Sequence, residues 1–268
     1  MRSNTLLAVA LGTALATAAV AEPTPPGINI RWNDCFSDGG DQNKSFACDT
    51  NAGSELAVLS LQLDTPMSQV SGVEIRITFK AAAGQVPAWW EFLEAQSCRR
   101  LGLSYVTSPQ LAGGNCPDWG LGFQAGAFVG YHPGEGGPET AVGHIVAAVP
   151  QQTLMTLDPG IEYTVGALRL NHTQSAGAGS CAGCDVPMCI LFSALKVTTS
   201  NPPAADRLFT QGANGESSQI IHWQNGRLAN LVNHCTSPID CVTAFDCINT
   251  SSTPTRQSTW GAVKALYR

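Results

Sequence analysis

The segment Val73-Glu74-Ile75-Arg76-Ile77-Thr78-Phe79 decides the fold class. Four apolar residues alternate in it with three polar ones, which is the pattern of a β-strand that buries one face. Further short apolar runs lie at 28–32, 55–63, 101–107, 121–131, 142–149, 161–170, 189–198, 207–210 and 219–224. Clusters of glycine, proline and asparagine separate these runs, as is typical of turns. The sequence therefore predicts an all-β fold, an antiparallel, jelly-roll-like β-sandwich.

Helical signals are few and short. We expect one turn after Pro87 within 86–93, another within 151–157, and a third within 259–267 near the C-terminus. A Ser/Thr/Pro-rich stretch at 249–256 has the composition of a linker. The predicted organisation is a signal peptide at 1–21, a single sandwich domain at 22–248, and a linker with a C-terminal tail at 249–268.

The composition excludes two classes of protein. The chain has 268 residues, of which 44% are hydrophobic and 13% charged, and its formal net charge is −6. A nucleic-acid-binding protein needs basic surface to displace counterions, so no nucleic-acid partner is expected. The hydrophobic content is also too high, and the net charge too low, for a disordered chain.

The N-terminus has the pattern of an export signal. Arg2 precedes an apolar run at 6–20, and Ala19-Val20-Ala21 fits the small-x-small cleavage motif. The run is shorter than the roughly 20 residues that span a bilayer. We therefore expect a secreted or cell-surface protein without a transmembrane span after signal cleavage.

An even number of cysteines in an exported chain predicts a disulfide framework. The ten are Cys35, Cys48, Cys98, Cys116, Cys181, Cys184, Cys189, Cys235, Cys241 and Cys247. Short spacing favours the local pairs Cys35–Cys48 and Cys98–Cys116. The remaining six form two groups of three, so at least one bridge should join the groups. The C-x2-C spacing at Cys181 and Cys184 also fits a pair of zinc ligands. The oxidising compartment of an exported protein favours disulfides instead.

The best candidate metal site is a loop rich in oxygen ligands. Its members are Asp34, Asp38, Asp41, Asn43 and Asp49, and calcium prefers such ligands on flexible loops. The spacing is not that of an EF-hand, and aspartate and glycine also simply form turns. A structural calcium is the one cofactor that the sequence suggests.

Aromatic residues give a second candidate site. Trp89, Trp90, Trp119 and Tyr131 offer flat rings that can stack on a sugar, and the same residue types also fill cores. Because Trp89 and Trp90 are adjacent, we expect one of them to point inward and the other outward. An extracellular glycan or a cell-surface component is the partner that this interpretation implies.

Catalytic signals are weak, and no catalytic residue is assigned. The chain has no G-x-S-x-G motif, and its five histidines occur in unrelated sequence contexts. His144 and His222 fall within predicted strands, where a structural role is the simplest one. Glu91 and Glu94 lie close together beside two tryptophans, and a glycosidase uses a pair of carboxylates. Three residues of separation place them poorly to straddle a glycosidic bond.

Four passages resemble a family of uncharacterised exported bacterial proteins. These passages are R-W-N-D-C-F at 31–36 with F-A-C-D-T-N-A-G at 46–53, V-P-A-W-W-E-F at 86–92, the cysteine run at 181–189, and S-T-W-G-A-V-K-A-L-Y-R at 258–268. The ending T-W-G-x-V-K-x-L-Y-R is the most specific. The resemblance implies no activity, ligand or catalytic residue. It does imply that Cys235 and Cys241 form an added pair, which leaves Cys247 as the partner for the three-cysteine run.

The C-terminal tail has two interpretations. Its aromatic and aliphatic residues favour docking on the sandwich, because apolar faces seek burial. Its place after a linker and its basic end also fit a sorting or attachment signal. Altogether, the sequence predicts an exported, non-catalytic binding or structural protein of the extracellular space or cell surface. The alternatives are a secreted hydrolase acting on polysaccharide or another extracellular polymer, and a calcium-stabilised adhesion scaffold.

Overall fold

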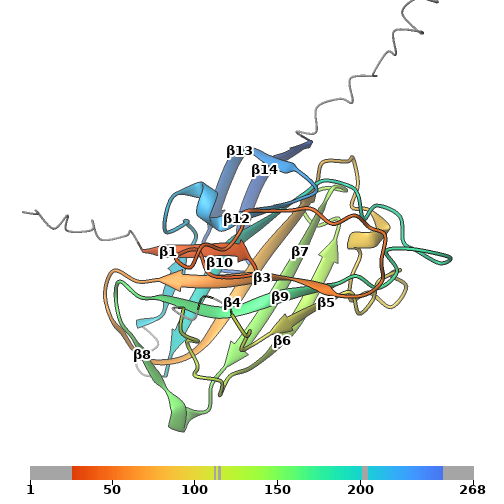
Figure 1. Ribbon diagram of the computed structural model, residues 1–268. Helices are drawn as coiled ribbons and strands as arrows, with labels where there is room; N and C mark the ends of the chain where they lie inside the picture. The colour runs from red at the N-terminus through yellow and green to blue at the C-terminus, as the bar shows by residue number, and fades with distance from the viewer. Residues whose placement is uncertain (1–25, 112, 114–115, 201–204, 250–268) are drawn as a thin grey trace, which may run out of the picture.

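The computed structural model describes residues 26–249, except 112, 114–115 and 201–204. Two sheets pack face to face in it (Figure 1), and all strand pairs but one are antiparallel. The predicted all-β antiparallel sandwich is therefore confirmed. The predicted signal peptide, the C-terminal tail and the proposed helix within 259–267 lie outside the described residues.

The smaller sheet has the strand order β1-β3-β9-β5. Its strands are β1 (Gly27–Trp32), β3 (Ser54–Gln62), β9 (Glu162–Asn171) and β5 (Leu103–Val106). All four were expected from the sequence within a few residues.

The larger sheet has the strand order β2-β12-β10-β4-β7-β6. Its strands are β2 (Asn43–Lys44), β12 (Ile220–Trp223), β10 (Met188–Thr199), β4 (Met67–Ala81), β7 (Thr140–Ala148) and β6 (Ala125–Pro133). Two short strands pair at its margins, β11 (Arg207–Phe209) with β10 and β8 (Met155–Leu157) with β4. β2 pairs with β12 in parallel.

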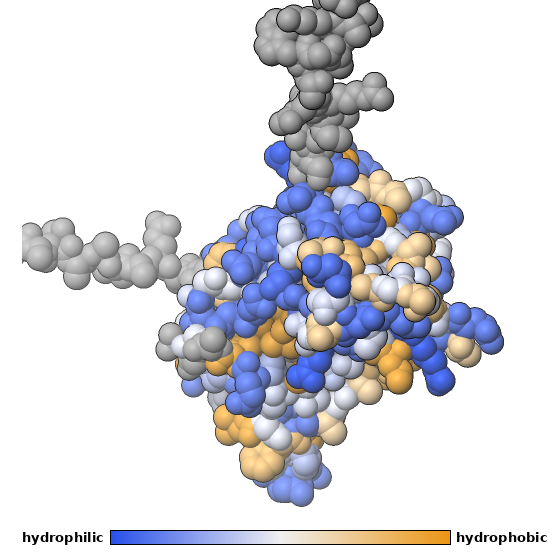
Figure 2. Space-filling model, turned by 45° about the vertical axis from the view of Figure 1, so that its right-hand side comes forward, coloured by the Kyte–Doolittle hydropathy of each residue, from blue (hydrophilic) through white to orange (hydrophobic). Residues whose placement is uncertain are grey.

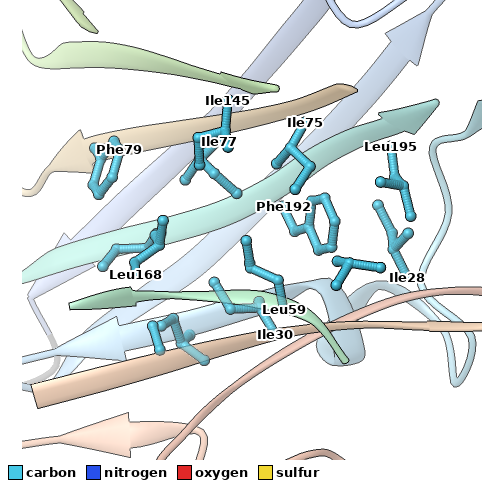
Figure 3. Close-up of a cluster of buried hydrophobic side chains, with 14 of the residues drawn as sticks. Ile28, Ile30, Leu59, Ile75, Ile77, Phe79, Ile145, Leu168, Phe192 and Leu195 are labelled. Carbon is cyan, nitrogen blue, oxygen red and sulfur yellow. The ribbon is translucent and has the colours of Figure 1, made fainter. Parts of the chain in front are cut away.

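The alternation in β4 builds the core as predicted. Val73, Ile75, Ile77 and Phe79 are at most 2% exposed. Figure 3 shows three of them opposite Leu59 and Leu168 of the smaller sheet. Each fully buried aliphatic or aromatic side chain contributes about 1.5–3 kcal/mol by leaving water, so this layer dominates the stability of the fold.

A hairpin that the sequence patterns did not predict covers part of the outer face of the larger sheet. Strands β13 (Gly226–Cys235) and β14 (Cys241–Asn249) pair with each other and pack on β10, β12 and β4. Figure 1 shows this hairpin in blue beside β12. Phe245 and the Cys189–Cys247 disulfide form a small apolar cluster beneath it. The cover explains why β10 is apolar on both faces.

No α-helix occurs in the described residues. The turn expected after Pro87 is the 3₁₀ turn η1 (Ala88–Trp90), and η4 (Glu216–Gln219) is another 3₁₀ turn. The helical turn expected within 151–157 is partly wrong. It ends as η2 (Gln151–Thr153), and the chain then continues as β8, which pairs with β4.

Five disulfides join the ten cysteines, but the two predicted local pairs are wrong. The bridges are Cys35–Cys116, Cys48–Cys184, Cys98–Cys181, Cys189–Cys247 and Cys235–Cys241. Three of them close loops of 81 to 136 residues, because the sandwich brings segments from distant parts of the chain into contact. The bridge predicted between the two cysteine groups and the pair Cys235–Cys241 are confirmed.

The surface is mainly polar, although only 13% of the residues in the chain are charged. Figure 2 shows a mainly hydrophilic face on which apolar residues form small, separated patches. Within the described part of the chain, no helix has the length and apolar character needed to cross a membrane.

Candidate functional site

The larger sheet ends in an edge strand, β6, which β5 of the smaller sheet approaches without pairing with it. Within the described residues, β6 pairs with β7 and with no other strand. Ala125, Gly126 and Ala127 are exposed, and so is Val129, which is an extra residue in the pairing with β7. An edge strand offers unpaired N–H and C=O groups to a further strand.

The loop after η1 lies beside this edge and is held firmly. The Leu93 N–H donates to the Arg100 carbonyl at 3.1 Å, and the Ser97 N–H donates to the Glu94 carbonyl at 3.1 Å. The Cys98–Cys181 disulfide anchors the far end of the loop. Its exposed side therefore presents Glu91 and Glu94 from a fixed backbone.

Two adjoining hollows separate the loop from β6. One, of about 410 Å³, is lined by Glu91, Glu94, Gln96, Ser97, His132 and Pro133. The other, of about 290 Å³, is lined by Leu93, Glu94 and the five residues 128–132 of β6. Successive side chains of a strand point to opposite faces, so only the edge of β6 can present five consecutive residues to one hollow. We call the two hollows together the edge groove.

A buried tyrosine joins the two walls of the edge groove. The Tyr131 hydroxyl donates to the Trp90 carbonyl, so β6 and the loop are connected beneath the hollows. Burial, and then the charge of Glu91, raise the pKa of Tyr131 well above its ordinary value. Tyr131 therefore stays a neutral hydrogen-bond donor, and the negative charge of the groove belongs to Glu91 and Glu94.

A polar cluster lies next to the groove on the outer face of the sheet. The His132 and His144 rings are 6.1 Å apart between centroids, and His144 Nε2 is 3.3 Å from Arg76 Nη1. Arg76 in turn forms an ion pair with Glu135 at 2.9 Å. Burial and the charge of Arg76 lower the pKa of His144. The imidazole of His144 is therefore neutral at pH 7, and its lone pair can face the guanidinium.

The predicted ring platform is not a surface feature. Trp89, Trp90 and Trp119 are 0% exposed and Tyr131 is 2% exposed, so no ring face is open to a sugar. The expectation that one of the adjacent tryptophans points outward is wrong. Trp89 and Trp223 stack at 5.3 Å between centroids, and Phe92 packs against both Trp89 and Trp90. These rings form the end of the core.

The predicted calcium ligands do not converge. Within the described residues, no group of three or more His, Cys, Asp or Glu side chains is placed to hold a metal ion. The Asp34 carboxylate accepts N–H groups from Cys35 at 2.9 Å and Gly113 at 2.6 Å. Asn43 Oδ1 lies 3.0 Å from His222 Nδ1, while Asp41 and Asp49 are exposed. Asp38 is half-buried, and one of its carboxylate oxygens lacks a hydrogen-bond partner among the described residues.

The edge groove combines features that the sequence showed only separately. Glu91 and Glu94 drew attention as a carboxylate pair, and the structure places both in one hollow with His132. His132 lies about forty positions further along the chain, and no spacing rule connects it to them. The only local signal was the apolar, glycine-containing run at 125–130, which fits an exposed edge strand.

Comparison with known proteins adds little to this geometry. No protein-family model matches the chain. No curated protein matches it either. Among solved structures, it is similar to the second type II cohesin module from the cellulosomal adaptor ScaA scaffoldin of Acetivibrio cellulolyticus, with 9% sequence identity and a TM-score of 0.32. That alignment covers 65% of this chain and 85% of the other, and a likeness at this score carries no functional argument.

Proposed function

We propose that the chain is an exported, non-catalytic binding protein that holds an extended, basic segment of a partner protein along β6. The observation that carries this proposal is the edge groove itself. An exposed strand edge, an apolar wall and two carboxylates lie side by side in it.

The backbone of β6 supplies the affinity in this proposal. An added strand forms main-chain hydrogen bonds with an exposed sheet edge, and its alternate side chains enter neighbouring pockets. Phe128 is half-buried and Val129 is 67% exposed, so an apolar side chain of the partner gains contacts there. The bulge at Val129 interrupts the regular pairing of β6 with β7, and such an interruption favours one partner segment over general aggregation.

The charge of the groove determines the chemistry of the partner. Glu91 is half-buried and Glu94 exposed, and neither has an ion pair among the described residues. A lysine or arginine of the partner gains from both carboxylates, while an acidic residue is repelled. An alternating apolar and basic segment therefore suits the groove.

Export is part of the proposal. All ten cysteines are paired, and disulfides form and persist in oxidising compartments such as the periplasm or the extracellular space. The N-terminal signal-like segment points to the same destination. Intact-mass analysis of the protein from its native host, with and without reduction, tests cleavage after Ala21 and the number of bridges.

Binding of alternating octapeptides tests the groove. We expect a fluorescent Lys/Val octapeptide to bind and to slow amide hydrogen exchange in β6, and a Glu/Val octapeptide not to bind. Each exposed charge pair is worth about 0.2–1 kcal/mol, so Glu91→Gln with Glu94→Gln should weaken binding about twofold to thirtyfold. The double variant Asp49→Asn with Glu216→Gln removes two exposed charges elsewhere and should leave binding unchanged. Equal binding of both octapeptides, or of neither, contradicts the proposal.

The shared hollow also favours one alternative, a secreted hydrolase. Glu91 and Glu94 line the same open cavity, as two carboxylates of a glycosidase do. Glu94 is exposed, however, and a general acid needs an environment that keeps its carboxyl protonated. Release of reducing sugar from a polysaccharide panel, lost in Glu91→Gln or Glu94→Gln, would establish the hydrolase and displace the binding function.

A further inference from the structure

A second pocket lies at the opposite edge of the larger sheet from the edge groove, beside β2 and β12. It has a volume of about 310 Å³ and is lined by Gln42, Asn43, His222, Asn225, Gly226 and Arg227. The volume is at the lower end of the range for small-molecule sites, about 300–1,000 Å³. The pocket therefore suits a ligand the size of a monosaccharide.

The tautomer and the charge of the His222 imidazole are determined by its neighbours. Asn43 Oδ1 can only accept a hydrogen bond, so the Nδ1 of His222, 3.0 Å away, carries the proton and donates it. Nε2 is then an acceptor, and it has no hydrogen-bond partner among the described residues. Burial, Arg31 and Arg227 lower the pKa of His222 to about 4, so the ring is neutral at pH 7.

A buried acceptor without a donor is costly, and this one belongs to the wall of a pocket. An unsatisfied buried polar group costs about 1–3 kcal/mol. His222 as a whole is 8% exposed, and Nε2 is shielded from solvent by its surroundings. A ligand hydroxyl that donates to Nε2 would recover this energy.

Positive charge dominates the pocket. Arg227 is exposed at its mouth, and Arg31 lies close enough behind His222 to influence its pKa. Among the described residues, no carboxylate lines the pocket, while Gln42 and Asn43 add amide groups. Gln42 Nε2 already donates to the Ser217 carbonyl at 3.0 Å, so its amide oxygen is the group left for a ligand.

We infer that this pocket binds an acidic monosaccharide unit, with a ligand hydroxyl donating to His222 Nε2 and a ligand carboxylate held by Arg227. Arg227 is exposed, so its long side chain can turn toward the carboxylate. Because Nε2 is closed off in this structure, the side chains around it must shift for a ligand to reach it. The pocket shares no lining residue with the edge groove, so ligand binding here is tested independently of the proposed peptide binding.

Titration with three small molecules tests the pocket. D-glucuronate carries hydroxyls and a carboxylate, glucose lacks the carboxylate, and propionate lacks the hydroxyls. We expect glucuronate alone to bind measurably, with chemical-shift changes confined to the residues that line the pocket. The Nε2 nitrogen signal of His222 should move with glucuronate and stay in place with propionate, which reports the hydroxyl contact in the unaltered protein.

Two arginine variants provide the matched comparison. Arg227→Gln should raise the Kd for glucuronate about tenfold, the loss expected for one charge-assisted hydrogen bond. Arg169→Gln removes an exposed arginine from the smaller sheet and should leave the Kd unchanged. Equal affinity for glucuronate and glucose, an unchanged Kd in Arg227→Gln, or shifts centred elsewhere would each overturn the inference.

Discussion

The guanidinium carbon of Arg99 lies 3.4 Å from the ring centroid of Trp89, and Arg99 is 1% exposed. Its N–H groups donate to the backbone carbonyls of Trp89, Asn171 and Thr173. Burial lowers the pKa of this guanidinium to about 9. The charged group thus joins η1, the loop after it and the end of β9 from inside the aromatic cluster.

Replacement of Arg99 should destabilise the fold strongly. We expect Arg99→Met to lower the free energy of unfolding by about 3 kcal/mol, because the carbonyls that it satisfies lose their donor. Arg99→Lys should cost less, since it keeps the charge over Trp89 but supplies fewer donors. Chemical denaturation measures both. The exposed neighbour Arg100 is the control, and Arg100→Met should change stability by less than about 0.5 kcal/mol.

The disulfides should contribute differently to the free energy of unfolding, according to the length of the loop that each one closes. Cys48–Cys184 spans 136 residues and Cys235–Cys241 spans 6. Chain-entropy arguments give about 5 kcal/mol for the long loop and about 2 kcal/mol for the short one. Paired serine substitutions at each bridge, compared by thermal unfolding, test this order. A larger loss at Cys235–Cys241 would show that unfolded-state entropy does not control their contributions.

Acid should destabilise the protein partly through His222. The pKa of its imidazole is about 4 in the fold and near 6.5 when unfolded, so the unfolded chain binds more protons between these values. Stability therefore falls as pH drops from about 6.5 toward 4. With allowance for partial solvation, we expect a loss of about 2 kcal/mol from this group.

His222→Gln isolates that contribution, because glutamine can still donate to Asn43 but does not titrate. Its urea-denaturation profile should be flatter than that of the original protein across the same pH range. The exposed His234 provides the control, and His234→Gln should keep the original slope. Parallel profiles for all three proteins would contradict the assignment.

Asp34 should act as a hydrogen-bonding group of the loop, with or without a metal. Its carboxylate satisfies the N–H groups of Cys35 and Gly113, so Asp34→Ala should lower the free energy of unfolding by about 2 kcal/mol. We expect a chelator to leave the Tm of the original protein unchanged. A rise in Tm with added calcium, growing with its concentration, would instead establish a calcium site.

The sandwich could be predicted because its main strands show their alternation locally. β4 alone defines a buried and an outer face, and most of its neighbours follow from similar runs. The β13–β14 hairpin escaped notice because its apolar residues are divided between an exposed face and the side that packs on the sheet. Val232 and Val242 face solvent, while Phe245 is buried beneath the hairpin. Periodicity alone did not show that a third layer was present.

The disulfides and the site depend on contacts that no local pattern encodes. Cys48 lies 13 positions from Cys35, yet each pairs with a cysteine beyond β4, because the chain crosses between them from the smaller sheet to β2 of the larger sheet. Trp89 and Trp90 were expected on opposite sides because they are adjacent in sequence, but the predicted turn, a 3₁₀ turn, buries both. His132 meets Glu91 and Glu94 only because β6 is the last strand of its sheet.

The Cys189–Cys247 bridge has a mechanical consequence. Cys247 lies two residues before the end of β14, and Cys189 lies within β10, which is paired on both sides in the larger sheet. A force applied to the chain beyond Asn249 passes through a covalent bond to β10, and the hydrogen bonds of the hairpin carry little of it. Under tension, the protein should resist extension until the larger sheet itself shears, and reduction of this one bridge should let the hairpin peel away first.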